Sequence, residues 1–166
     1  MTACTGPSES ENGPLEDQGG HGWGGIVVDV NQAFTDEFEV LIFDEPITLT
    51  SLELVDAPSE MQIIDVLLAG PERHQNGQVS YKFPPKVDGA DELHPAFNTV
   101  LDPSEMGHQL LIGLRVTREG KWKRGGLKVH YESQGVKYVL TTIAELTVCT
   151  PKFVASDGSC PMEDID

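Results

Sequence analysis

Apolar and polar residues alternate most regularly in the C-terminal third of the chain. Every second side chain is apolar in QLLIGLRVT, residues 109–117, and LKVHYE at 127–132 repeats the pattern with His130 on its polar, solvent-facing side. The segment VKYVLTTIAELTV at 136–148 is long and mostly apolar. A period of two is typical of strands that bury one face. We therefore predict a three-stranded antiparallel meander here.

Shorter apolar runs precede this region and predict further strands. They lie at 24–30, 37–43, 46–55, 61–69 and 78–83. Within 46–55 the apolar positions change parity at Thr50-Ser51, which predicts a β-bulge because side chains alternate along a strand. The run at 61–69 fits either a buried strand or a short helix, since periodicity does not separate the two for short apolar runs.

Together these segments predict an all-β protein. About eight short strands separated by turn residues, without a convincing helix, favour an immunoglobulin-like antiparallel β-sandwich. A jelly roll or a small barrel is the alternative. We place the sandwich domain at 23–150, preceded by a tether at 1–22 and followed by a tail at 151–166.

The tether prediction rests on composition. The opening segment MTACTGPSESENGPLEDQGGHG is rich in Gly, Ser, Pro and acidic residues and holds almost nothing that a core could use. Such a composition is typical of flexible linkers. We therefore expect residues 1–22 to be a disordered acidic tether.

The formal charge of the chain is −16, and its acidic residues are unevenly distributed. Residues 1–72 contain 15 of the 27 Asp and Glu residues and no Lys or Arg. Such a surface repels phosphate backbones, so we expect no nucleic-acid partner. We interpret it as a solubilising surface. The alternative is a calcium site at a sandwich edge, built from Asp36, Glu37, Asp44 and Glu45.

Two of the three cysteines are placed to form a disulfide. Cys149 ends the last apolar run and Cys160 lies in the tail, eleven positions later. A loop of this length closes easily, so we predict a bridge that ties the tail to the last strand. Persistent disulfides indicate an oxidising compartment. Two unrelated thiols in a cytosolic protein are the alternative.

The third cysteine, Cys4, has a different context. Met1-Thr2-Ala3-Cys4 resembles the end of a bacterial lipobox, in which a small residue precedes the lipidated cysteine, although this family prefers Leu where Met1 stands. The resemblance implies a lipoprotein anchored to the bacterial cell membrane through Cys4, with a signal peptide upstream. Residues 110–149 also resemble the C-terminal part of uncharacterised secreted bacterial proteins, which implies no activity.

A basic segment, REGKWKRGG at 118–126, is the main candidate binding site. We expect a hairpin tip that displays Trp122 between Lys121 and Lys123, with Arg124 beside them. Trp and Arg are favoured at binding hot spots, so this tip could dock a cell-envelope protein or a glycan. Two alternatives remain: the loop rests on the acidic half of this protein, or Trp122 packs into the sandwich.

The chain contains one further candidate for chemistry. Met106 and His108 place a thioether and an imidazole close together, a ligand set suited to copper, so an extracytoplasmic copper carrier is the second functional hypothesis. The sequence contains no nucleophile elbow, P-loop, dinucleotide fingerprint or zinc-protease motif. We therefore expect a non-enzymatic binding or structural role at the cell surface, without a cofactor.

Overall fold

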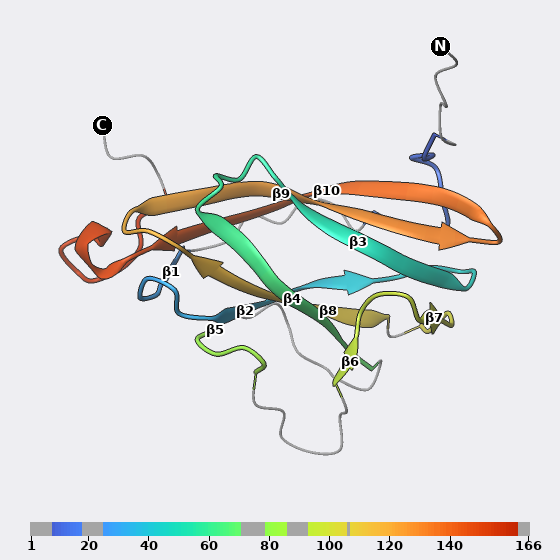
Figure 1. The fold of residues 1–166 in the computed structure, drawn as a ribbon, viewed down its shortest axis with the longest axis horizontal. Helices are drawn as coiled ribbons and strands as arrows, with labels where there is room; N and C mark the ends of the chain where they lie inside the picture. Colours follow the sequence, from blue (N-terminus) through green and yellow to red (C-terminus); the bar gives the residue numbers. More distant parts are fainter. Residues whose placement is uncertain (1–7, 18–24, 71–78, 86–92, 106, 163–166) are drawn as a thin grey trace, which may run out of the picture.

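The protein consists of two five-stranded β-sheets packed face to face (Figure 1). The computed structural model describes residues 8–17, 25–70, 79–85, 93–105 and 107–162. Its elements are β1 (Gly25–Val27), β2 (Phe34–Leu41), β3 (Ile47–Val55), β4 (Met61–Ala69), β5 (Val79–Ser80), β6 (Leu93–Pro95), β7 (Val100–Leu101), β8 (His108–Val116), β9 (Lys121–Ser133), β10 (Val136–Cys149) and the short 3-10 helix η1 (Pro151–Phe153). The first sheet has the order β1-β10-β9-β3-β7, and the second has the order β5-β2-β8-β4-β6.

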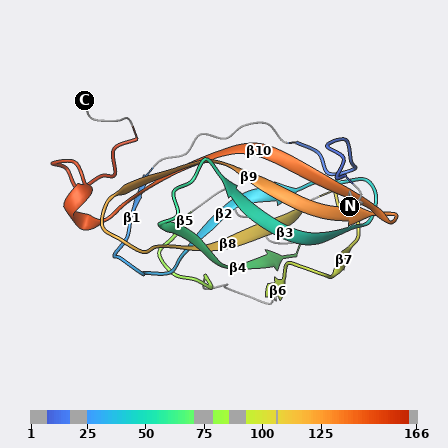
Figure 2. The same ribbon diagram turned by 45° about the horizontal axis from the view of Figure 1, so that its top comes forward.

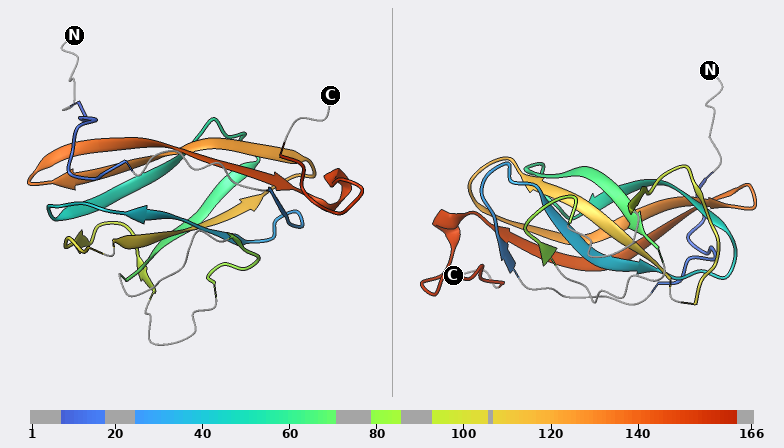
Figure 3. Two further views of the ribbon diagram at one scale, coloured as in Figure 1. Left: turned by 180° about the vertical axis from the view of Figure 1, so that it is seen from behind. Right: turned by 90° about the horizontal axis from the view of Figure 1, so that it is seen from below.

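The core fills the space between the two sheets. From β8 it receives Leu110, Ile112, Leu114 and Val116, the alternating set expected from the sequence. Burying side chains of this kind contributes roughly 1.5–3 kcal/mol each. The facing sheet supplies the inward side chains of β3, β9 and β10, so the two layers are held by one apolar core. Figure 3 shows both layers from behind and from below.

The strand order is that of an immunoglobulin-like sandwich, as predicted. Strands β2, β8 and β4 take the places of B, E and D, and β3, β9 and β10 take those of C, F and G. One edge departs from the antiparallel pattern that we expected, because β1 pairs in parallel with β10. The parity change in β3 is also confirmed, with a register shift between Leu49 and Ser51. The ambiguous run at 61–69 is strand β4.

The predicted three-stranded meander is wrong. β9 and β10 form an antiparallel hairpin, but β8 lies in the other sheet between β2 and β4. Periodicity shows that a strand buries one face, and it does not show which strand lies beside it. The four-residue connection at 117–120 crosses between the sheets, so β8 and β9 face each other across the core instead of pairing.

Residues 8–17 lie against the domain, which corrects the expected tether over this stretch (Figure 2). The Ser10 amide donates to the Lys137 carbonyl at 3.0 Å, and the Val139 amide donates to the Ser10 carbonyl at 2.9 Å. Leu15 is 5% exposed and belongs to the core. A segment with too few apolar residues to form its own core can still pack on the core of a folded domain. The rest of 1–22 is outside the described residues.

The predicted disulfide joins Cys149 at the end of β10 to Cys160 in the tail, with 5.5 Å between their Cα atoms. It sits directly over β1. A Cβ atom built on Gly25 would come within 2.5 Å of the Cys160 Cβ atom, so only glycine fits at this contact. The tail therefore covers the edge strand β1 as well as the end of β10.

Candidate functional site

A buried ion pair links the two sheets. The Arg124 guanidinium of β9 lies 2.8 Å from the Asp36 carboxylate of β2, and the two side chains are only 1% and 2% exposed. Arg124 also donates from Nε to the Ala144 carbonyl at 2.8 Å. Charges at this depth require pairing. In antibody domains a disulfide joins strands B and F across the core; here a charge pair joins the strands in those places.

The glycines of β9 explain how Arg124 enters the core. Opposite Gly125 and Gly126 the pairing of β9 with β10 shifts register, between Ile143 and Leu146. A Cβ atom on Gly126 would clash with the Thr142 carbonyl oxygen, so a side chain is excluded there. The shift changes which β9 residues face inward. Arg124 is thereby removed from the exposed basic site that the sequence predicts.

Asp36 is likewise unavailable to the calcium site considered from the sequence. Its carboxylate faces Arg124 inside the sandwich, and Glu37 is also buried, whereas Asp44 and Glu45 are exposed in the turn after β2. These four acids therefore do not share one exposed edge. Within the residues that the structure describes, no three His, Cys, Asp or Glu side chains are grouped to hold a metal ion.

Trp122 is a strand residue rather than the tip of a hairpin. It lies in β9, packs its half-buried ring against the core, and donates from Nε1 to the Arg118 carbonyl at 3.0 Å. The Arg118 guanidinium lies 5.4 Å from the ring centroid, within the range of a cation–π contact. Immunoglobulin-like domains place a tyrosine at this corner, two residues before the F-strand cysteine, with the same backbone bond. This contact supports the alternative in which Trp122 packs into the sandwich.

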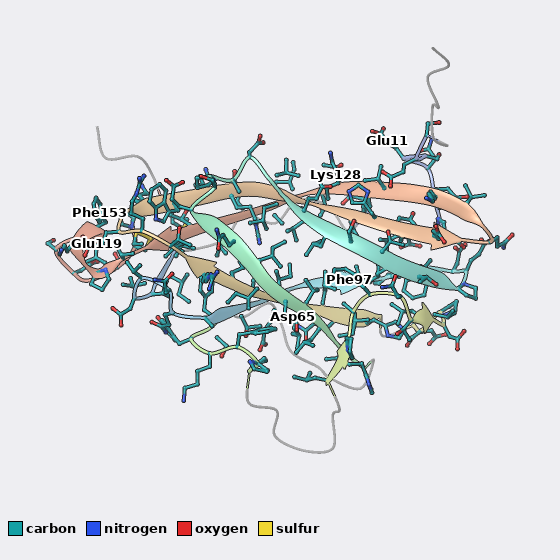
Figure 4. All side chains as sticks on the ribbon, viewed as in Figure 1. Glu11, Asp65, Phe97, Glu119, Lys128 and Phe153 are labelled. Atoms are coloured by element: carbon teal, nitrogen blue, oxygen red, sulfur yellow. A yellow bond between two sulfur atoms is a disulfide. The ribbon has the colours of Figure 1, made fainter. Side chains whose placement is uncertain are left out.

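Two segments meet at this end of the sandwich, which we call the disulfide end: residues 117–120 and 150–160. The Gly120 amide donates to the Thr150 hydroxyl, and the Thr150 amide donates to the Gly120 carbonyl, both at 3.0 Å. Lys152 lies 2.8 Å from Glu119. Figure 4 shows Glu119 and Phe153 close together here. The disulfide and these bonds fix one continuous surface.

Phe153 is the aromatic side chain that this surface exposes, with 46% of it open to solvent. Beyond it, the Ser159 hydroxyl and amide both donate to Asp157, and these bonds hold the pKa of the Asp157 carboxyl below its usual value. The turn that leads back to Cys160 is thus fixed by its own polar groups. Phe153 is not among the predicted binding residues, although its place inside the predicted disulfide loop was a usable signal.

The cations near the disulfide end are paired, so the surface is not simply basic. Arg118 lies 2.7 Å from Glu60, and Lys123 lies 3.5 Å from Glu145. Lys121 is half-buried at the start of β9. Of the predicted binding residues, Lys121 and Lys123 therefore flank this end, whereas Arg124 does not reach its surface. Recognition here would depend on shape and aromatic contact more than on charge.

The opposite end of the sandwich holds a second polar cluster. The Nδ1 atom of His130 lies 2.9 Å from Glu9, and its Nε2 atom lies 3.1 Å from Glu53. His130, expected to face solvent, has a side chain only 14% exposed because residues 8–17 cover it. Its two ring nitrogens face different carboxylates. This geometry holds the N-terminal segment on the sheet and does not converge on a metal ion.

The copper hypothesis gains no support from the surroundings of His108. Its Nε2 atom lies 2.8 Å from the Asp102 carbonyl, and its ring stacks on Phe43 with 5.5 Å between centroids. Met106 lies outside the described residues. These contacts place His108 as the first residue of β8, packed against the turn that precedes it.

Comparison with other proteins adds no identification: no protein-family model matches the chain, and no curated protein matches it. Cys4 is outside the described residues, so its lipidation stays a prediction. In the described part of the chain, no helix has the length and apolar character needed to cross a membrane.

Proposed function

We propose that this chain is a bacterial lipoprotein, anchored to the cell membrane through Cys4, whose immunoglobulin-like domain has a non-enzymatic binding or structural role outside the cytoplasm. The Cys149–Cys160 disulfide is the observation that carries this proposal, because such bonds persist in oxidising compartments. With these two cysteines paired, Cys4 is the remaining thiol, and it stands in the lipobox-like sequence.

The disulfide end is the surface that we assign to partner binding. Loops at the ends of β-sandwiches are frequent recognition sites because the sheets hold them in place. Here a covalent bond closes the loop that presents Phe153, so little conformational freedom is lost when a partner binds. A cell-envelope protein or a glycan, which an exposed aromatic ring can contact, is the class of partner that fits.

The anchor and the compartment are tested by the intact mass of the native protein, extracted from the membranes of its own host. We expect a diacylglyceryl-sized increase on the peptide that begins at Cys4, and a gain of two hydrogens on reduction. An unmodified protein with free thiols in the soluble fraction would overturn both parts of the proposal.

The binding surface is tested separately with the purified domain and isolated cell envelopes of the host. Phe153→Ser should abolish most of the binding. Ile143→Ser is the matched control, because Ile143 is also an exposed apolar side chain and lies on a strand instead of in the disulfide loop. Equal binding by the two variants would remove the disulfide end as the binding surface.

A further inference from the structure

The N-terminal strap, residues 8–17, is attached along one side of the domain and not at a single point. Ser10 pairs with the start of β10, beside the β9–β10 turn, and the Glu16 amide donates to the Ile42 carbonyl at 2.9 Å. Between them the Leu15 amide donates to the Tyr131 hydroxyl at 3.3 Å. Thr142 donates to Asp17 at 3.2 Å. These contacts make the strap part of the folded domain.

Side chains of the strap hold it at both ends. Glu9 reaches over β10 to His130, whose other ring nitrogen faces Glu53 on β3, so three segments are joined by one imidazole. Leu15 inserts into the core beside the stacked rings of Tyr131 and Tyr138. Polar and apolar contacts thus fix the strap at separate points along its length.

The docked strap shortens the connection between Cys4 and the domain. Ser10 is only six positions after Cys4, and six extended residues span at most about 20 Å. A free tether that ran to Trp23 would span up to about 60 Å. If Cys4 carries the lipid, the place where Ser10 meets β10 is therefore held close to the membrane surface.

This attachment point lies at one end of the molecule. β10 runs from the hairpin turn beside Ser10 to Cys149 at the disulfide end, 14 residues that extend over about 45 Å. Figure 1 shows the strap and the disulfide-closed tail at opposite ends of the long axis. The net charge of −16 opposes adhesion of the domain to anionic lipid, so the position of the anchor decides which end faces the membrane.

We infer that the docked strap orients the domain on the membrane, with the β9–β10 turn toward the lipid and the disulfide end toward the surroundings. This inference rests on the proposed lipid anchor. The surface that carries Phe153 is then the part of the protein farthest from the membrane, where a protein or glycan of the envelope can reach it.

The test uses the chain from Cys4 onward, coupled through the Cys4 thiol to a maleimide lipid in nanodiscs of mixed zwitterionic and anionic phospholipid. A lipid-borne gadolinium chelate broadens amide signals near the membrane. We expect Gly135 in the β9–β10 turn to lose far more signal than Gly158 in the tail. Equal loss at the two glycines, or greater loss at Gly158, would overturn the inferred orientation.

Three variants connect the orientation to the strap. Leu15→Asp should release the strap and bring the losses at Gly135 and Gly158 close together. Glu9→Gln, which keeps the core intact, should cause a smaller decrease in the ratio of the signal loss at Gly135 to that at Gly158. Glu11→Gln is its control, because Glu11 is an exposed acid of the same segment. An unchanged ratio in both Leu15→Asp and Glu9→Gln would contradict the role of the strap.

Failure of this inference differs from failure of the proposed function. The nanodisc sample carries a lipid by construction, so it reports orientation whether or not the native protein is lipidated. A native protein without the diacylglyceryl group, in the mass measurement above, would remove the anchor and leave the strap geometry intact. A lipidated native protein with equal signal loss at both ends would remove the orientation alone.

Discussion

The two terminal segments fold back on the same sandwich by different means. At one end, residues 150–160 are held by a covalent bond between Cys149 and Cys160. At the other, residues 8–17 are held by hydrogen bonds, one buried leucine and a histidine between two carboxylates. The first attachment responds to reductant, whereas the second responds to charge, pH and packing. One fold therefore carries two attachments that can be broken independently.

The buried pair of Asp36 and Arg124 lies in the sandwich between these two attachments. Removing it should destabilise the domain and so increase opening at both attachments. Asp36→Ala leaves the Arg124 guanidinium buried without its counter-charge, and we expect a loss of about 3–5 kcal/mol in the free energy of unfolding. Urea unfolding measures this loss. Amide exchange should rise at both ends together, since the whole domain opens more often.

Asp44→Ala is the control for this variant, because it removes an exposed acid just beyond the same strand and should change stability by no more than about 0.5 kcal/mol. Equal free energies of unfolding for the Asp36 and Asp44 variants would contradict a stabilising role for the Asp36–Arg124 pair. The double variant Asp36→Leu with Arg124→Met should recover most of the loss, because a buried pair replaced by apolar side chains is often neutral.

The next largest effect should be strongest at the disulfide end. Replacing Cys149 and Cys160 together with Ser removes an eleven-residue cross-link, which the chain-entropy relation values at about 3 kcal/mol. Amide exchange should increase most at β1 and in the tail, which lose their local cross-link, and by less at the strap. Increased exchange at Ser10 and Val139 without any change at β1 would contradict this prediction, because the disulfide would then stabilise the strap and not the strand beside it.

These two attachments also differ in how far the sequence predicts them. Cysteine spacing predicted the disulfide, because a covalent partner must be another cysteine. Nothing in the composition around Leu15 predicts docking, since its partners, Tyr131 and β10, are distant in the chain. Periodicity predicted the sandwich and the buried face of β8, and it misassigned β8 to the sheet of β9, because alternation does not identify a neighbouring strand.

The candidate site was predicted in part for the same reason. The basic residues of 118–126 do lie near one end of the sandwich, but the Gly125-Gly126 register shift sends Arg124 inward to Asp36. Two signals were available: an acid, Asp36, directly before the predicted strand at 37–43 and a Gly-Gly pair next to an arginine. Their partnership depends on which strands face each other across the core, and a single sequence does not contain that information.

High pH should lower the stability of the domain through Tyr131, the residue whose hydroxyl bonds the strap. Burial raises the pKa of the Tyr131 hydroxyl above its ordinary value of 10.0, an effect that the Leu15 amide hydrogen bond partly opposes and the neighbouring Tyr138 adds to. The folded state therefore holds this proton more tightly than the unfolded state, so stability falls as pH rises above 10.0. The measurement is urea unfolding at several alkaline pH values. Tyr131→Phe should show a smaller fall than the parent protein; an equal fall would assign the effect to other groups.

The smallest expected effect is at the polar contact of the strap. Glu9→Gln removes one of the two carboxylates that face His130 and should lower the free energy of unfolding by about 0.5 kcal/mol, because partly exposed ion pairs contribute little. Amide exchange is the more sensitive measurement: protection of Ser10 and Val139 should fall, while β1 and the tail stay unchanged. The effect should be lost in high salt, which screens the pair in the parent protein. If Glu11→Gln lowers the same protection equally, the loss reflects the overall charge of the strap and His130 plays no specific part in holding it.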